Sequence, residues 1–258
     1  MDQLSDVRSA RAPEGRVKPR LNVRLAENQE EILAAQKLRW QVFAEEMGAR
    51  LPSRTPGVDH DLYDPYCDHL IVRDERSGRV VGTYRVLPPE AARRVGGYYS
   101  ETEFDLTRLG HLRSSLVEIG RSCIDAEFRT GAVIALLWAG LARYMQQGDH
   151  HYLMGCASIG MRDGGHNAAG IYNVLAEHQA PLEYRVFPRC PLPLDKIEAA
   201  AAPEVPPLLK GYMRAGAWIC GEPAWDPDFN TADLLLLLPM TRVDSRYSRH
   251  FVEREQQS

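Results

Sequence analysis

The stretch 116–123, Leu-Val-Glu-Ile-Gly-Arg-Ser-Cys, sets a carboxylate and a guanidinium three residues apart among apolar neighbours. Its composition is typical of a strand, whose period of two points successive side chains to opposite faces. One face then carries Glu118, Gly120 and Ser122, and the other carries Val117, Ile119, Arg121 and Cys123. A mid-strand carboxylate beside a glycine suits a general base, because partial burial raises its pKa and the glycine admits a ligand. An exposed structural glutamate is the alternative that this stretch leaves open.

Two further arginines lie among residues that are expected to be partly buried. Arg39 shares a helical face with Phe43, four residues on, and the same spacing also fits an amphipathic boundary with a surface arginine. Arg85 follows Val81 at the period of a strand, so burial of one predicts burial of the other. A buried arginine is costly unless carboxylates meet it. The alternative is an outward Arg85 on a half-exposed strand.

Acidic residues concentrate on the N-terminal side of Arg85. From Glu27 to Glu75 the chain has eleven Asp and Glu against five Lys and Arg. Asp61 and Asp64 are the obvious partners for buried arginines, and the cluster also fits a site for a cationic substrate. A calcium-binding loop is not indicated, because its ligand spacing is missing.

Metal and thiol chemistry find little support in the sequence. His150 and His151 would point to opposite faces of a strand, and His166 has no matched acidic ligands. Cys156 fits a buried thiol better than a nucleophile. The five cysteines are scattered and form no Cys-x-x-Cys pair, which favours reduced thiols over disulfides or structural zinc. We expect no metal and no bound cofactor.

Composition narrows the class of protein. The 258 residues carry a net charge of −4, which argues against nucleic acid as a partner. The longest run of small and apolar residues, 131–142, is too short to cross a bilayer, and the N-terminus has no signal-peptide pattern. We therefore expect a cytoplasmic protein, and the composition is equally compatible with peripheral contact at the inner face of the membrane.

The pattern of elements predicts an α/β fold with one mixed sheet covered by helices on both faces. Asn28 and Glu31 have the spacing of a capping box and open the first helix. The helix over 131–145 is apolar on most of its surface and should pack on the sheet. Strands are expected at 21–25, 69–74, 80–87, 116–124, 152–157, 184–187, 217–220 and 233–238, and helices also at 168–178 and 208–217.

The sequence predicts that the chain consists of three segments. Residues 1–20 are rich in arginine, proline and glycine and poor in apolar residues, which predicts a flexible N-terminal arm. Residues 21–251 show no internal repeat and no linker, which predicts a single domain. Residues 252–258 are expected to form a flexible tail.

Taken together, these segments resemble a known group of enzymes. Leu38-Arg39, Asp61-x-Tyr-Asp64, Gly82-Thr-Tyr-Arg85 and Glu118-x-x-Arg121 resemble the acyl-homoserine-lactone synthases, which are GNAT-like acyltransferases. A fuller resemblance, over residues 21–251, is to the L-ornithine N(α)-acyltransferases of the hemolysin-like GNAT branch. It rests on Phe43-Ala-Glu-Glu-Met-Gly, Cys67-Asp-His-Leu, Val81-Gly-Thr-Tyr-Arg, Tyr99-Ser-Glu-x-Glu-Phe-Asp-Leu, Glu118-Ile-Gly-Arg-Ser-Cys, Leu137-Trp-x-Gly-Leu, Gly155-Cys-Ala-Ser and Leu209-Lys-Gly-Tyr.

This resemblance implies a GNAT-like, mainly antiparallel sheet and a specific reaction. The α-amine of L-ornithine would attack a 3-hydroxyacyl thioester of acyl carrier protein, giving lyso-ornithine lipid in the first step of ornithine lipid synthesis. Acetyl-CoA-dependent relatives usually carry an [RQ]-x-x-G-x-[GA] loop before the central helix. Residues 127–132 do not fit that loop, which favours a carrier-protein donor over free coenzyme A.

The resemblance also suggests roles for individual residues. The catalytic pair would be Glu118, as general base, and Arg121. Substrate would be held by Arg39, Phe43, Asp61, Asp64, Arg85, Ser122, Cys123 and Trp138. Within this set, Arg85 or Arg121 would bind the substrate carboxylate, and Phe43 and Trp138 would line an acyl groove. Asp61, Asp64 and Asp68 would either bind the δ-ammonium or brace Arg39 and Arg85.

Two other functions stay open at this point. One is an N-acyltransferase for another amino acid, or an acyl-homoserine-lactone synthase, although no adenosine pocket for S-adenosylmethionine is evident. The other is a non-catalytic module that binds acyl chains or membranes.

Overall fold

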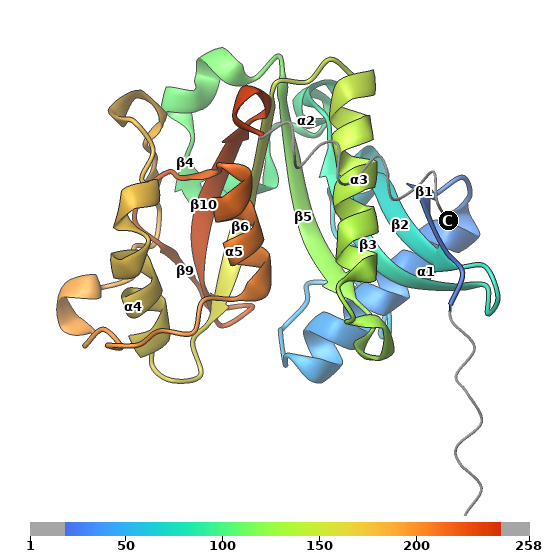
Figure 1. Ribbon diagram of the computed structural model, residues 1–258, viewed down its shortest axis with the longest axis horizontal. Coiled ribbons are helices and arrows are strands. Elements are labelled where there is room, and N and C mark those ends of the chain that lie inside the picture. The colour runs from blue at the N-terminus through green and yellow to red at the C-terminus, as the bar shows by residue number, and fades with distance from the viewer. Residues whose placement is uncertain (1–18, 244–258) are drawn as a thin grey trace, which may run out of the picture.

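A computed structural model describes residues 19–243 (Figure 1). The expected arm over 1–20 lies outside this range except for its last two residues, and the expected tail over 252–258 lies wholly outside it. The strands are β1 (Leu21–Leu25), β2 (Asp68–Asp74), β3 (Arg79–Leu87), β4 (Phe104–Asp105), β5 (Leu116–Ile124), β6 (Tyr152–Gly160), β7 (Phe187–Pro188), β8 (Trp218–Ile219), β9 (Ala224–Asp226) and β10 (Thr231–Pro239). The α-helices are α1 (Gln29–Trp40), α2 (Pro89–Val95), α3 (Ala132–Gln147), α4 (His166–Val174) and α5 (Pro207–Ala215).

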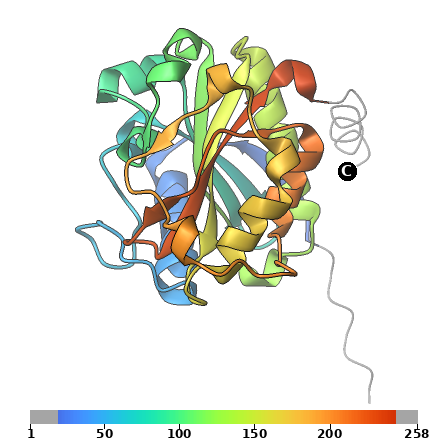
Figure 2. The ribbon, with the colours of Figure 1, turned by 90° about the vertical axis from the view of Figure 1, so that its left-hand side faces the viewer.

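Eight of these strands form one sheet in the order β1-β2-β3-β5-β6-β10-β8, with β9 added beside β10. Among the described strands of this sheet, β5 and β6 form the one parallel pair. Figure 2 looks onto β10 and the segments packed around it. The mixed, mainly antiparallel sheet confirms the predicted fold class.

The sheet is covered on both faces. On one face, a Cβ added at Gly82 would lie 2.4 Å from Val133 of α3, so the glycine permits the close packing of that helix. On the other face, Cys123, which pairs with Thr83, packs against Leu38 of α1. Because the neighbours Gly82 and Thr83 point to opposite faces of β3, α1 and α3 lie on opposite sides of the sheet (Figure 1).

Most helices and strands lie where the local sequence pattern predicts them. The Asn28 side chain caps α1 by accepting the backbone N–H of Glu31 at 3.0 Å, as the spacing predicts. The hairpin of β2 and β3 and the bounds of β5 also match the prediction. The strand predicted over 184–187 is wrong: residues 182–184 form a 3-10 turn, and the chain extends only at 187–188. Tyr184 instead stacks on Trp218, and this tertiary contact outweighs the local strand preference.

A bulge interrupts β5 beside β3. Gly120 lies opposite Arg85 and Cys123 lies opposite Thr83, so β5 has one residue more than β3 in this interval. Arg121 lies in this interval and has a left-handed backbone with a φ of 50°. An extra residue of this kind reverses the alternation of side chains beyond it.

The bulge corrects the predicted faces of β5. Arg121 lies on the same face as Glu118, since both contact Tyr99. Ser122 turns to the opposite face, beside the phenol of Tyr84. Period two had placed Glu118 with Ser122 and apart from Arg121, because a strict alternation takes no account of a bulge.

Among the described residues, no helix is long and apolar enough to cross a membrane.

Candidate active site

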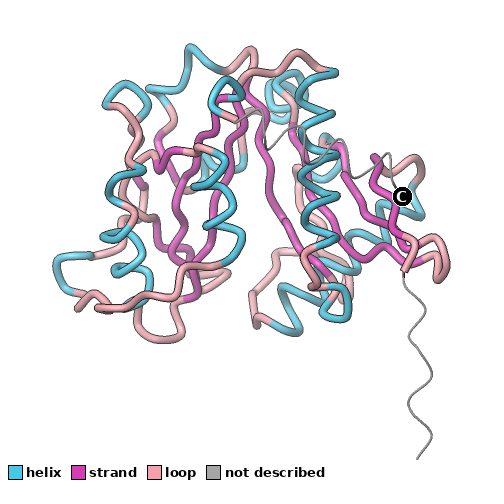
Figure 3. Tube along the Cα trace, in the orientation of Figure 1, coloured by secondary structure: helices cyan, strands magenta, loops and turns pink. Residues whose placement is uncertain are grey.

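The central opening of the sheet lies between β5 and β6. Their pairing runs only from Leu116–Tyr152 to Glu118–Met154, although both strands continue for six more residues. The two traces lie close at one end and separate toward the other (Figure 3). A cavity of about 240 Å³ occupies the separated part and is lined by residues of both strands. Backbone groups here face a cavity instead of a neighbouring strand, which suits them to bind a ligand.

Glu118 borders this cavity and is 5% exposed. Its Oε2 accepts the backbone N–H of Tyr99 at 2.6 Å, and its Oε1 accepts the N–H and the hydroxyl of Ser100 at 2.7 and 2.5 Å. These donors open a 3-10 turn at 99–102. Burial raises the pKa of Glu118, while the hydrogen bonds from Ser100 and Tyr99 oppose the rise. The result is a positioned carboxylate whose pKa is shifted toward that of an amine.

Arg121 borders the same cavity and lies between two aromatic rings. Its guanidinium carbon is 4.8 Å from the centre of the Tyr99 ring and 4.6 Å from that of Phe229. Its Nε lies 3.3 Å from Asp59 Oδ2, and its Nη2 lies 3.5 Å from Asp61 Oδ2. Stacking on two rings holds the guanidinium plane against the cavity that Arg121 lines.

The remaining predicted arginines and aspartates form one buried network. Asp64 bridges two arginines: its Oδ1 lies 2.6 Å from Arg39 Nη2, and its Oδ2 lies 3.1 Å from Arg85 Nη1. Arg39 also pairs with Asp59 at 2.9 Å, and Arg85 with Asp61 at 2.6 Å. Although burial acts to raise it, the pKa of Asp64 is held well below its usual range by Arg39 and Arg85. Asp61 and Asp64 therefore brace arginines, which is the alternative that the sequence left open.

Arg85 faces inward and is 4% exposed, so the inward alternative holds. Its guanidinium also lies over the rings of Tyr63 and Tyr99, at 5.8 and 5.6 Å. Both Arg85 and Arg121 border the cavity, whereas Arg39 lies behind them, fully buried. Asp68, the third candidate for the δ-ammonium, accepts the hydroxyl of Tyr144 at 2.7 Å.

The other predicted residues do not all meet at one place. Phe43 and Ser122 line the cavity. Cys123 is buried in the cluster of α1 and β5 described above. Trp138 packs against Tyr212, with tilted rings whose centres are 5.2 Å apart, and lines a small apolar cavity of about 60 Å³. Phe43 and Trp138 border different cavities, and Leu153, Tyr212 and Leu238 line both of them.

The structure adds residues that the analysis of single segments missed. Tyr99 and Ser100 hold Glu118, and the only sequence signal for them is the segment Tyr99-Ser-Glu-x-Glu-Phe-Asp-Leu. Asp233 borders the cavity from β10, where it is the charged residue of a buried strand that is mostly leucine. A lone acid in a buried strand is a detectable signal. The positions of Tyr99 and Ser100 depend on long-range packing.

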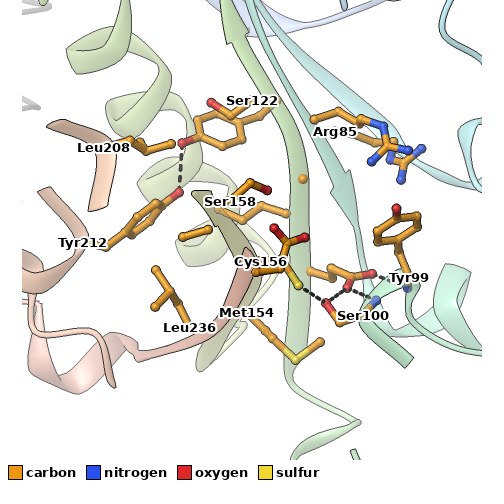
Figure 4. A pocket seen from close by; sticks show the side chains of 18 of the residues that line it. Arg85, Tyr99, Ser100, Ser122, Met154, Cys156, Ser158, Leu208, Tyr212 and Leu236 are labelled. Carbon is orange, nitrogen blue, oxygen red and sulfur yellow. Dashed lines mark hydrogen bonds between the residues drawn. The ribbon is translucent and has the colours of Figure 1, made fainter. Parts of the chain in front are cut away.

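The cavity has two chemically distinct sides (Figure 4). Arg85, Tyr99 and Ser100 lie on one side, and Leu208, Tyr212 and Leu236 lie on the other. Such a site can bind an acyl chain on its apolar side and a small charged molecule on its polar side. A sheet that opens beside a parallel strand pair, with a carboxylate at the opening, provides the geometry for acyl transfer to an amine.

Residues 38–139 match the acetyltransferase (GNAT) domain family. Fold and site together define a GNAT-type N-acyltransferase. The chain is 38% identical over 248 residues to the L-ornithine N(alpha)-acyltransferase of Agrobacterium fabrum (strain C58), with 90% of this chain and 85% of that protein covered. The enzyme of the same name from Brucella abortus (strain 2308) is 36% identical, with 90% and 88% covered. The chain belongs to the L-ornithine N(alpha)-acyltransferase family, which confirms the predicted resemblance.

Solved structures agree on the fold. The acyl-homoserine lactone synthase BjaI, described as CoA-dependent and solved with SAM and isopentyl-CoA, aligns with a TM-score of 0.53 at 16% identity, covering 88% of this chain and 82% of BjaI. FeeM, an N-acyl amino acid synthase from uncultured soil microbes, aligns with a TM-score of 0.54 at 13% identity, covering 88% and 94%. At these identities the likeness concerns the fold alone.

Proposed function

We propose that this enzyme transfers a 3-hydroxy fatty acyl group from acyl carrier protein to the α-amine of L-ornithine, giving lyso-ornithine lipid. Membership of the family supports L-ornithine as the acceptor, since its curated members are named L-ornithine N(alpha)-acyltransferase. The observation that carries the mechanism is the meeting of Glu118, Arg85 and Arg121 at the cavity where β5 and β6 separate.

Glu118 is the general base of this mechanism. A free α-ammonium titrates near pH ~8 and is no nucleophile while protonated. Glu118 takes that proton directly or through one water, and the raised pKa of the carboxyl brings it closer to the pKa of the amine. The neutral amine attacks the thioester carbonyl, and the C–S bond breaks as the amide forms. The nitrogen gives its second proton to the departing carrier thiolate, which leaves as a thiol, and Glu118 releases the first proton to solvent.

The arginines orient the amino acid. A planar guanidinium suits a carboxylate because two parallel N–H groups reach both oxygens. Arg121 and Arg85 border the cavity, and their aromatic neighbours and aspartates fix them in place. Binding of the substrate carboxylate there would turn the α-amine toward Glu118, and orientation of this kind lowers the barrier to reaction.

The acyl chain fits the apolar side of the cavity. Leu208, Leu209, Leu236 and Leu238 line that side. Each CH₂ removed from water there contributes about 0.8 kcal/mol. Backbone N–H groups of β5 near Arg121–Cys123, where β5 and β6 are no longer paired, would stabilise the negative charge that develops on the thioester oxygen.

Acyl carrier protein is the proposed donor and partner, with no resident cofactor. Carrier proteins are acidic, and exposed arginines such as Arg93 and Arg94 at the end of α2 would steer their docking. We propose a cytoplasmic location, which is also compatible with peripheral contact at the inner face of the membrane.

Purified protein tests the proposal. With 3-hydroxymyristoyl carrier protein and L-ornithine, free carrier thiol should appear together with a product of the mass of N(α)-(3-hydroxymyristoyl)-ornithine. The same acyl group on coenzyme A compares the two donors. Equal thiol release without an amino acid would identify a thioesterase and contradict the proposal, as would acylation of the δ-amine.

A further inference from the structure

A second group of ionisable side chains, two acids and a thiol, is linked to Glu118 through Ser100. Glu103, Cys156 and Asp233 each present a side-chain oxygen or sulfur atom, and these atoms lie within 4.8 Å of one another. Glu103 follows the 3-10 turn that holds Glu118, Cys156 comes from β6 and Asp233 from β10. Cys156 and Asp233 also border the central cavity.

Several polar atoms in this group have no hydrogen-bond partner among the described residues. Oδ1 of Asp233 and the hydroxyl of Thr231 are buried in this state, on side chains that border the cavity and are only 4% and 2% exposed. Both carboxyl oxygens of Glu103 are also buried and face Asp233 and Cys156 of the same group. Unsatisfied buried acceptors cost free energy, so this arrangement is suited to a bound donor.

We propose that Glu103 and Asp233 bind the side-chain ammonium of the acceptor amino acid and thereby select a diamino acid over a neutral one. This inference rests on the proposed function and adds the residues that set its acceptor specificity. An ammonium supplies three N–H donors and a positive charge, which match a pair of carboxylates and the Thr231 hydroxyl.

The spacing fits the two amines of ornithine. Ser100 Oγ is 2.5 Å from Glu118 and 3.5 Å from the sulfur of Cys156, which belongs to the acid group itself. Two side chains therefore separate the general base from the acid pair. The α- and δ-nitrogens of extended ornithine are about 6 Å apart, as five bonds allow, so one molecule can reach both.

The charges of the cavity also match an amino acid of this kind. Arg121 on one side fits the α-carboxylate, Glu118 the α-amine and Asp233 the distal ammonium. Burial, and then the charge of Asp233, raise the pKa of Glu103, and the positive charge of a bound ammonium would act in the opposite direction. Asp226, which also borders the cavity, acts in the same direction as Asp233.

A metal ion suits this group less well. A first-row metal would require Cys156 as a thiolate, and burial together with the nearby acids raises the pKa of that thiol well above its usual value. A cation that brings its own hydrogen-bond donors needs no thiolate.

The test compares ornithine with norvaline, which has the same carbon chain without the δ-amine. Wild-type enzyme should favour ornithine in kcat/KM by at least about 10-fold. Asp233→Asn should lower kcat/KM for ornithine by about 10- to 100-fold, the worth of a hydrogen bond to a charged group, and leave norvaline within about 3-fold. Glu103→Gln should act in the same direction. The matched control is Asp195→Asn, at an exposed aspartate, which should leave kcat/KM unchanged for both substrates.

Calorimetric binding of both amino acids, without donor, separates this inference from the proposed function. Wild-type protein should bind ornithine more tightly than norvaline, and Asp233→Asn should lose the difference. An unchanged ornithine-to-norvaline ratio in both variants would overturn the inference while leaving ornithine acylation intact. Stoichiometric metal in the purified protein, lost with activity on chelation, would also overturn it. Acylation of some other amine with no ornithine turnover would contradict the proposed function. In that case the calorimetric comparison of ornithine and norvaline would still test whether Glu103 and Asp233 bind a side-chain ammonium.

Discussion

Tyr99 links Glu118 to Arg121: its backbone N–H donates to the Glu118 carboxylate at 2.6 Å, and its ring lies 4.8 Å from the Arg121 guanidinium. One residue thus positions a base and a cation on the same side of β5. The bulge that carries Arg121 makes this arrangement available, since a regular strand would point the arginine to the opposite face. Because both groups border one cavity, a change at either should affect the reaction before it affects the fold.

Glu118→Gln tests the general base. We expect kcat to fall by about 10²–10⁴-fold, the usual contribution of such a group. The amide also turns a donor toward the N–H of Tyr99 or Ser100, so the free energy of unfolding should fall by about 1–3 kcal/mol. Single-turnover kinetics on protein shown by circular dichroism to be folded separates the two effects. Turnover close to wild type would remove Glu118 from the mechanism.

Ser100→Ala tests the same group through its pKa. The Ser100 hydroxyl lowers the pKa of Glu118, so its removal should raise that pKa. Since the ionised carboxylate is required, the rise of kcat/KM from low pH should move to higher pH by about one unit. Thr102→Ala is the matched control, because Thr102 lies in the same turn but its hydroxyl donates to the Tyr99 carbonyl and not to Glu118. An unmoved profile in Ser100→Ala would assign the titration to another residue.

Arg39→Met tests the buried ion network. Arg39 is fully buried between Asp59 and Asp64, so its removal takes one of two cations from each carboxylate. Asp59 then keeps only the longer contact with Arg121, and Asp64 keeps Arg85. Breaking such a pair costs about 3–5 kcal/mol of unfolding free energy. Arg93→Met removes an exposed partner of Glu90 and should change stability little. Equal urea midpoints for the two variants would show that Arg39 does not brace the site.

Two glycines near the strand separation should respond in opposite ways. A Cβ at Gly155 would lie 2.4 Å from the Ile119 carbonyl oxygen, so Gly155→Ala must shift the backbone and should lower the melting temperature. A Cβ at Gly120 meets nothing within 4 Å and would point into space beside the cavity. Gly120→Ala should therefore keep the wild-type melting temperature but raise KM. Melting curves and steady-state kinetics check both, and a destabilised Gly120→Ala would contradict the open geometry.

Glu103 should make stability depend on pH. Its raised pKa means that the folded protein keeps a proton that the unfolded chain releases, so its stabilising contribution is full at acid pH and declines as pH rises toward about 9. Replacing it with glutamine removes this decline. The stability gained by Glu103→Gln should grow between pH 5 and 9, by at most about 1.4 kcal/mol per pH unit. Urea unfolding across that range measures it, and a difference that does not vary with pH would contradict the raised pKa.

The sequence by itself determined the elements and the family. Alternation and capping are local patterns, so β5, the hairpin of β2 and β3 and the start of α1 were predicted well. The inward Arg85 and its aspartate partners followed from the cost of burying a charge. The motifs from Phe43 to Leu209 identified the family, since their order along the chain is more specific than any one of them.

Only the tertiary structure decided which side chains share the cavity. A bulge adds one residue to β5 and brings Arg121 to the face of Glu118, and no local period encodes that insertion. Glu103 and Asp233 meet although 130 positions separate them, because tertiary packing brings the segment after residue 102 to the side chains of β6 and β10. Periodicity reports the face of a strand, whereas strand pairing and strand separation depend on contacts across the whole chain.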